Sequence, residues 1–161
     1  MRNKLMLFIV AVALVACGST KTQTTNLSKR IMKGYWTLNT ITYSQSGEFN
    51  VTLFNDATAD CFKGSTWRFI PNNNTGIYTL SGLDCDATEK HFVSTFDKID
   101  KDSGLYDFLL KPTNEKHKSE TNNGFRVSLT HLDDTTMQWQ QTVSLDGKPF
   151  TIYMNFTKIN E

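Results

Sequence analysis

The side chains best suited to chemistry in this 161-residue chain are three cysteines and three histidines. Thiolates act as nucleophiles, pair as disulfides and bind metals, so the cysteines Cys17, Cys61 and Cys85 define the first alternatives. A zinc site usually shows closely spaced ligands, such as Cys-x-x-Cys or His-Glu-x-x-His. Neither spacing occurs and the histidines are scattered, so we predict no metal site.

Catalytic signatures are also missing from the sequence. The sequence contains no Gly-x-Ser-x-Gly elbow, which would expose a nucleophilic serine, and no pattern places a serine beside a histidine. Asp97 to Gly104 is acidic enough to suggest a calcium loop, but its glycine is out of register and no glutamate closes it. We therefore expect a solvated turn there, no cofactor and no enzymatic activity.

The composition favours an all-β fold without a nucleic-acid partner. The 17 basic residues nearly balance the 16 acidic ones, and no concentrated basic patch is available to bind phosphates. The chain contains 11 Phe, 5 Tyr and 3 Trp together with many Thr and Asn, a set that suits pleated strands and polar turns.

The N-terminus has the layout of an export signal. Met1 to Lys4 is short and positively charged, and Leu5 to Ala16 is an apolar run shorter than the roughly 20 residues that a membrane-spanning helix needs. The run ends in Leu14-Val15-Ala16-Cys17, which resembles the lipobox of bacterial lipoproteins. Residues 1–16 are therefore expected to form a signal peptide with a helical apolar core, and an ordinary secretory peptide with an incidental cysteine is the alternative.

The lipobox resemblance implies that Cys17 carries the lipid. It would receive a diacylglyceryl thioether, become the first residue after cleavage and gain a further acyl chain such as palmitate, which gives stable membrane anchoring. The polar residues 17–30 would then form a flexible tether. Gly18 to Lys21 lacks the acidic cluster that resembles a surface-export signal in Bacteroidota, so we expect an outer-membrane protein that faces the periplasm.

Lipidation of Cys17 would leave Cys61 and Cys85 as two thiols in a compartment where disulfides persist. We expect them to pair and to tie a loop-rich segment to a turn. Two reduced, buried thiols are the alternative.

Residues 31–161 are predicted to form one domain, because short alternating runs recur about every ten residues with turn signals between them. Consecutive hairpins of this kind favour an up-and-down antiparallel barrel of about eight strands. A helix is expected only at Asn55 to Phe62. The expected strands include Gly34 to Tyr43, Phe49 to Leu53, Thr66 to Ile70, Ile77 to Leu80, Phe92 to Ile99, Leu105 to Leu110, two alternating runs from Phe125 to Val143, and a final strand after the Asp146-Gly147 turn.

Gly34-Tyr35-Trp36 resembles the Gly-x-Trp signature of lipocalins, and it is followed by Thr66 to Phe69, Gly76 to Leu80 and Tyr153 to Lys158 in the order of the small lipocalin-like lipoproteins of Bacteroidota. Without a Thr-Asp-Tyr motif or a long C-terminal helix, the resemblance is to the wider calycin-like group. It implies that Trp36 closes one end of the barrel. A stack of Trp36 on Arg126 is one expectation, and a core Trp36 with an exposed Arg126 is the other.

The resemblance also implies that the barrel holds a small hydrophobic ligand, with polar side chains that orient it where they point inward. The candidate ligand-binding residues are Trp67, Phe69, Tyr78, Phe108, Arg126, His131, Trp139 and Met154. The alternative is a filled barrel that serves as a structural or interaction protein of the cell envelope, with the charged loop Lys111 to Asn123 meeting another envelope protein. In either case we expect a monomer.

Overall fold

The computed structural model of the chain describes residues 28–100, 102–119 and 121–159. The predicted signal peptide, Cys17 and most of the predicted tether lie outside the described residues. Within the described ranges, no helix is both long and apolar enough to cross a lipid bilayer.

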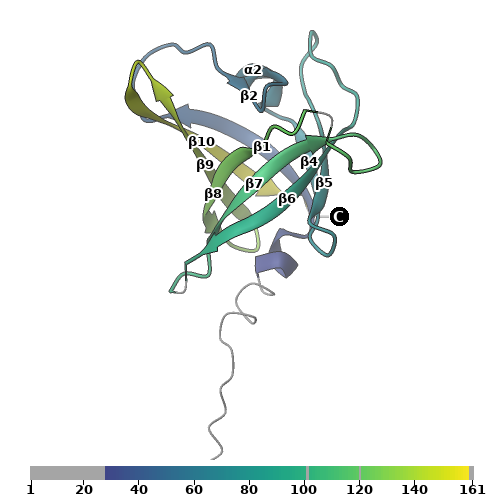
Figure 1. Cartoon of the computed structure of the whole chain (residues 1–161). Coiled ribbons are helices and arrows are strands. Elements are labelled where there is room, and N and C mark those ends of the chain that lie inside the picture. The colour runs from purple at the N-terminus through teal and green to yellow at the C-terminus, as the bar shows by residue number, and fades with distance from the viewer. Residues whose placement is uncertain (1–27, 101, 120, 160–161) are drawn as a thin grey trace, which may run out of the picture.

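The described residues form a closed antiparallel barrel of eight strands, in the order β1-β10-β9-β8-β7-β6-β5-β4 (Figure 1). From β4 onward each strand pairs with the next along the chain, and β1 closes the ring by pairing with both β10 and β4. The predicted all-β, up-and-down barrel is therefore confirmed. The barrel strands are β1 (Gly34–Tyr43), β4 (Thr66–Ile70), β5 (Thr75–Thr79), β6 (Lys90–Ile99), β7 (Tyr106–Thr113), β8 (Phe125–Leu132), β9 (Thr136–Leu145) and β10 (Lys148–Lys158).

Large aromatic side chains fill the barrel. Alternate residues of each strand point inward, and the three tryptophans Trp36, Trp67 and Trp139 are all fully buried. Trp67 and Trp139 meet edge to face with ring centroids 5.4 Å apart, and Phe156 packs within 5.8 Å of both rings. Burial of this much apolar surface is the main force that holds the sheet closed.

A helical turn, residues 28–32, lies across one end of the barrel (Figure 1). The Trp36 indole Nε1 donates a hydrogen bond to the Met32 carbonyl at 2.8 Å. Lys158 Nζ, from the last strand, donates to the Ile31 carbonyl at 2.5 Å and lies 5.2 Å from the centre of the Trp36 ring. Ser28, which the sequence assigned to the tether, is buried in this turn.

The cation over Trp36 is therefore Lys158, and the predicted stack with Arg126 is wrong. Arg126 precedes the buried Val127 in strand β8, and adjacent residues of a strand point to opposite faces of the sheet. The Arg126 side chain therefore points outward and is 64% exposed. There it pairs with Asp97 on β6.

The other end of the barrel is open and is partly covered by residues 49–62, which we call the cap (Figure 1). The cap contains a two-stranded hairpin of β2 (Thr52–Leu53) and β3 (Ala57–Thr58), followed by the single-turn helix α2 (Ala59–Phe62). The predicted strand at 49–53 and helix at 55–62 are thus both shorter than expected. The cap is fixed at its base by the predicted disulfide, which is confirmed between Cys61 and Cys85.

Candidate ligand-binding site

The cap inserts the aromatic side chain of Phe54 into the open end of the barrel. A tight turn places it there: the Asp56 amide donates to the Leu53 carbonyl at 2.9 Å, and Phe54 and Asn55 both adopt positive φ angles, of 53° and 54°. Asparagine tolerates this left-handed conformation, whereas phenylalanine is strained by it. The strain is compensated by burial, because Phe54 is only 3% exposed.

Phe54 packs against rings from three other parts of the molecule. Its centroid lies 5.6 Å from Phe62 on α2, 6.1 Å from Trp67 on β4 and 5.5 Å from Phe125 at the start of β8. All three contacts are edge to face, the favoured geometry for such pairs. Phe54 therefore joins the cap to opposite sides of the barrel.

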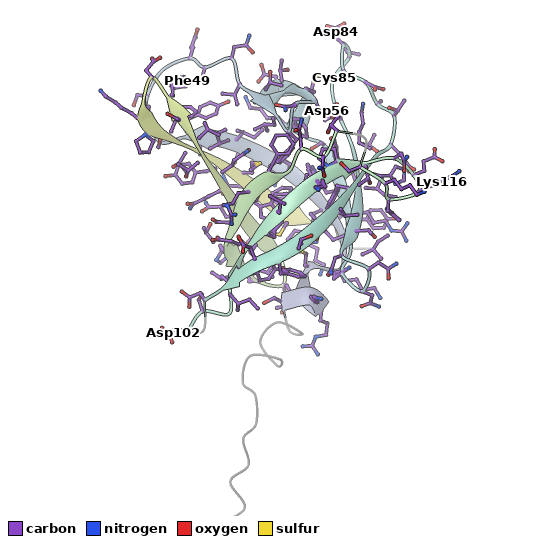
Figure 2. The ribbon with its side chains drawn as sticks, in the orientation of Figure 1. Phe49, Asp56, Asp84, Cys85, Asp102 and Lys116 are labelled. Atoms are coloured by element: carbon purple, nitrogen blue, oxygen red, sulfur yellow. A yellow bond between two sulfur atoms is a disulfide. The ribbon has the colours of Figure 1, made fainter. Side chains whose placement is uncertain are left out.

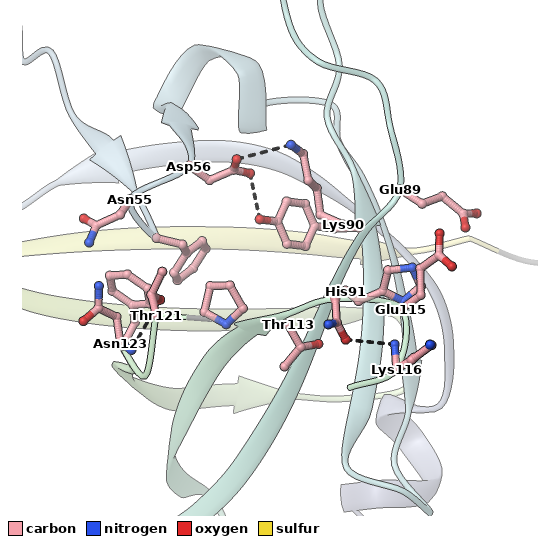
Figure 3. A pocket seen from close by; sticks show the side chains of 15 residues that line it. Asn55, Asp56, Glu89, Lys90, His91, Thr113, Glu115, Lys116, Thr121 and Asn123 are labelled. Atoms are coloured by element: carbon pink, nitrogen blue, oxygen red, sulfur yellow. Dashed lines mark hydrogen bonds and ion pairs between the residues drawn. The ribbon is translucent and has the colours of Figure 1, made fainter. Parts of the chain in front are cut away.

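Asp56 fastens the tip of the cap to the barrel wall (Figure 3). The buried Tyr78 hydroxyl donates to Asp56 Oδ2 at 2.7 Å, and Lys90 Nζ lies 3.5 Å from Asp56 Oδ1. Burial first, and then the hydrogen bond to Asp56, raise the pKa of Tyr78 far above its ordinary value. The phenol therefore stays neutral and continues to donate at physiological pH.

Lys90 has a second carboxylate partner, Asp86, whose Oδ2 lies 2.7 Å from Nζ. The hydrogen bond to Asp86 raises the pKa of Lys90, and the same bond, with others from Thr88, lowers the pKa of Asp86 to about 2. Lys90 is thus charged and lies between two carboxylates.

Two hollows adjoin Phe54 at the open end. The first, which we call the polar hollow, has a volume of about 580 Å³ and a wall that mixes charged and amide groups with a few apolar rings. It is lined by Phe54, Asn55, Asp56, Tyr78, Glu89, Lys90, His91, Pro112, Thr113, Asn114, Glu115, Lys116, Thr121, Asn123 and Phe125 (Figure 3). Figure 2 shows Asp56 and Lys116 at this end of the molecule and Asp102 at the other.

The second, the apolar hollow, has a volume of about 480 Å³ and lies beside the β9–β10 hairpin. Within it Phe49 contacts Phe150, with ring centroids 4.9 Å apart. The hollow is lined by Glu48, Phe49, Asn50, Val51, Thr52, Phe54, Asn55, Phe125, Gln141, Val143, Leu145, Phe150 and Ile152. Both volumes fall in the range of about 300–1,000 Å³ that is usual for small-molecule sites.

The strand order agrees with the resemblance seen in the sequence. The fold is a closed, up-and-down antiparallel β-barrel of eight strands. No protein-family model matches the chain, and no curated protein matches it in sequence.

Similar folds are found among solved structures of bovine odorant-binding protein. A complex with a selenium-containing odorant matches with a TM-score of 0.45 and 17% identity, over 84% of this chain and 74% of that one. A complex with the natural ligand matches with a TM-score of 0.41 and 16% identity. The protein from bovine nasal mucosa matches with a TM-score of 0.43 and 17% identity. Each match covers 84% of this chain and 75% of the other chain.

Of the residues predicted from the sequence to bind ligand, Tyr78 lines the polar hollow. Most of the other predicted ligand-binding residues are buried in the filled part of the barrel. This group consists of Trp67, Phe69, Phe108, Trp139 and Met154, none more than 5% exposed.

The two charged or polar candidates, Arg126 and His131, do not point inward, so that expectation is wrong. Alternation from Leu129 predicted an inward His131, but the β8–β9 register shifts between these two residues. Such a bulge changes the side of the sheet on which later residues lie. His131 is 54% exposed, and its Nε2 lies 2.9 Å from Asp133 Oδ2.

The sequence reasoning missed the wall that separates the hollows, formed by Phe54, Asn55 and Phe125. Leu53-Phe-Asn-Asp56 does contain a turn signal, because Asn and Asp tolerate or stabilise tight turns. The helix expected at Asn55 to Phe62 did not take this turn signal into account. In the part of the chain that the structure describes, no group of three His, Cys, Asp or Glu side chains is placed to hold a metal ion.

Proposed function

We propose that this protein is a non-enzymatic binding protein of the bacterial cell envelope that holds a small hydrophobic molecule at the open end of its barrel. The observation that carries the proposal is the pair of hollows on either side of Phe54. Because the tryptophan and phenylalanine rings fill the barrel below them, the ligand binds at the mouth rather than deep inside.

The apolar hollow is the part of the site that favours a hydrophobic ligand. Val143 and Leu145 are 40% and 38% exposed, and they border the buried Phe150 and Ile152. A ligand that covers this surface removes apolar area from water, which contributes about 25 cal/mol per Å².

The lipobox-like sequence ending at Cys17 supports a membrane anchor on the periplasmic face of the outer membrane. Metabolic labelling with palmitate tests the anchor: wild type should take up label and Cys17→Ala should not. Protease treatment of intact cells tests the orientation, because a domain that faces the periplasm is protected and a surface domain is removed.

The binding test is a titration of the full chain in lipid nanodiscs with N-phenylnaphthylamine, an uncharged apolar fluorophore. Energy transfer from tryptophan reports binding, because Trp67 contacts Phe54 at the edge of the site. Empty nanodiscs supply the blank. A signal no larger than that of the blank would exclude the proposal.

A matched pair of variants locates the bound fluorophore. Val143→Glu places a charge in the wall of the apolar hollow, whereas Ile159→Glu places one at a site of equal exposure, 39%, outside both hollows. We expect Val143→Glu to weaken binding at least tenfold, about 1.4 kcal/mol, and Ile159→Glu to leave it unchanged. Equal effects would show that the fluorophore binds elsewhere.

A second candidate function is an interaction protein of the envelope, and the filled interior of the barrel favours it. Its contact surface would be the loop Lys111 to Asn123, where Glu115 and Lys116 are exposed. Cross-linking in cells from this loop would yield one reproducible protein partner if this function holds, and none if the protein acts as a small-molecule binder.

A further inference from the structure

The two hollows at the open end differ in polarity and share one wall. Phe54, Asn55 and Phe125 line both hollows, so the same three residues separate them. The apolar hollow presents mainly aliphatic and aromatic carbon, whereas the polar hollow combines a few apolar rings with a comparable area of amides, hydroxyls and charges. A ligand that spans both sides must therefore be apolar at one end and polar at the other.

The charges around the polar hollow argue against an anionic head group. Three carboxylates, Asp56, Glu89 and Glu115, line it beside the cations Lys90 and Lys116. Lys90 is already neutralised by Asp56 and by Asp86. An incoming anion would thus meet a wall of net negative charge, and like charges at short range repel.

The apolar hollow offers no cation to compensate. Among the described residues that line it, Glu48 is the charged one. A carboxylate or phosphate head would therefore be desolvated without a partner at either end of the site, which is costly.

Two polar atoms in the wall of the polar hollow lack hydrogen-bond partners. They are Nδ1 of His91 and Oγ1 of Thr113, which belong to residues paired across the β6–β7 ladder. A buried polar atom without a partner is unfavourable, so a group that supplies the missing hydrogen bond is favoured there. Rotation of either side chain toward the hollow breaks no hydrogen bond, because neither atom makes one.

We propose that the ligand is a single-chain amphiphile whose hydrogen-bonding head carries no negative charge, such as an alcohol or a carboxamide. Its alkyl chain lies in the apolar hollow, and its head lies in the polar hollow beside His91 and Thr113. A hydroxyl or an amide can both donate and accept, which matches an imidazole nitrogen and a threonine hydroxyl. This inference rests on the proposed function and specifies its ligand class.

The test is displacement of bound N-phenylnaphthylamine from the full chain in nanodiscs by four compounds with the same alkyl chain: lauryl alcohol, lauramide, lauric acid and laurylamine. At neutral pH the first two are uncharged, the third is an anion and the fourth a cation. We expect the alcohol, the amide and the amine all to displace the fluorophore at concentrations at least tenfold below that of laurate, because only laurate brings a negative charge to the site. Equal or better displacement by laurate would overturn the inference.

Thr113→Val tests the head site, because valine keeps the shape of threonine and removes its hydroxyl. We expect the preference for alcohol over laurate to fall about threefold to tenfold. Thr42→Val, an exposed β1 threonine outside the hollows, is the matched control and should leave the preference intact.

The two levels of the proposal fail differently. If N-phenylnaphthylamine does not bind, the proposed function fails. If it binds but the four head groups compete equally, or if Thr113→Val and Thr42→Val behave alike, the head site alone is refuted.

Discussion

Replacement of Phe54 should separate the two roles of this side chain, as a strained part of the cap and as a wall between hollows. Phe→Ala at a buried site costs about 3–5 kcal/mol, and the cost here should lie near 3 kcal/mol because the hollows on both sides leave less packing to lose. Alanine at the φ of 53° retains a left-handed penalty of roughly 1 kcal/mol that glycine does not have. Glycine is usually the more destabilising residue by roughly 0.5–1 kcal/mol. Relief of the left-handed penalty offsets that cost, so we expect Phe54→Gly to be at least as stable as Phe54→Ala, by up to about 0.5 kcal/mol.

The free energy of unfolding is measured by urea denaturation of the full chain, followed by tryptophan fluorescence. Phe150 is the matched control, because it is also 3% exposed and lines the apolar hollow but lies in strand β10. There we expect the ordinary order, with Phe150→Gly less stable than Phe150→Ala by roughly 0.5–1 kcal/mol. The reasoning about backbone strain is refuted if both positions show the same order of Ala and Gly.

The same variants change binding in the opposite direction from stability. Removal of the Phe54 ring joins the hollows, so Phe54→Ala should bind lauryl alcohol more tightly even though the protein unfolds more easily. The measurement is the displacement assay at a urea-free condition where the variant is folded. Weaker binding in proportion to lost stability would show that Phe54 helps to hold the ligand instead of blocking it.

Three further predictions concern features away from Phe54. Lys158→Met should lower the free energy of unfolding by about 1–2 kcal/mol, because it removes both the hydrogen bond to the N-terminal turn and the cation over Trp36. Lys158→Arg keeps a cation and should lose less stability. Equal losses for the two variants in urea denaturation would contradict this prediction. The double variant Cys61→Ser, Cys85→Ser lacks the disulfide, and its free energy of unfolding should be about 3 kcal/mol lower, the chain-entropy value for a separation of 24 residues. The measurement is urea denaturation without reductant, and an unchanged midpoint would contradict the prediction. Because the pKa of Tyr78 is raised in the folded protein, the phenol ionises more readily in the unfolded chain, and the free energy of unfolding should fall as the pH rises above about 10. In Tyr78→Phe the free energy of unfolding should fall less steeply with pH in this range. Identical pH dependence in the two proteins would rule out this cause.

The barrel could be predicted from the sequence because its strands carry their own signals. Gly34 to Tyr43 and Thr66 to Ile70 were predicted with the bounds that the structure shows, and Asp146-Gly147 forms the expected turn with positive φ at both residues. In each case the alternation of one face and the turn chemistry are local properties of the chain.

The candidate site could not be predicted in the same way. His131 was misplaced because a bulge in the pairing with β9 is invisible to a strict period of two. The hollows depend on how the cap crosses the barrel mouth, and the position of Phe54 follows from contacts with Phe62, Trp67 and the sequence-distant Phe125. Local patterns hold no information about such contacts.

The closure of the barrel by its first and last strands has a consequence for how the chain folds during synthesis. Lys158 reaches the Ile31 carbonyl across 127 positions of the chain, and Trp36 is paired with Lys158 in the ladder. Until β10 has been made, β1 and β9 each leave an edge without a partner, and the closed end lacks its cation. Such long-range pairing slows folding and exposes open sheet edges. The nascent chain is therefore exposed to aggregation through these edges until β10 has been synthesised.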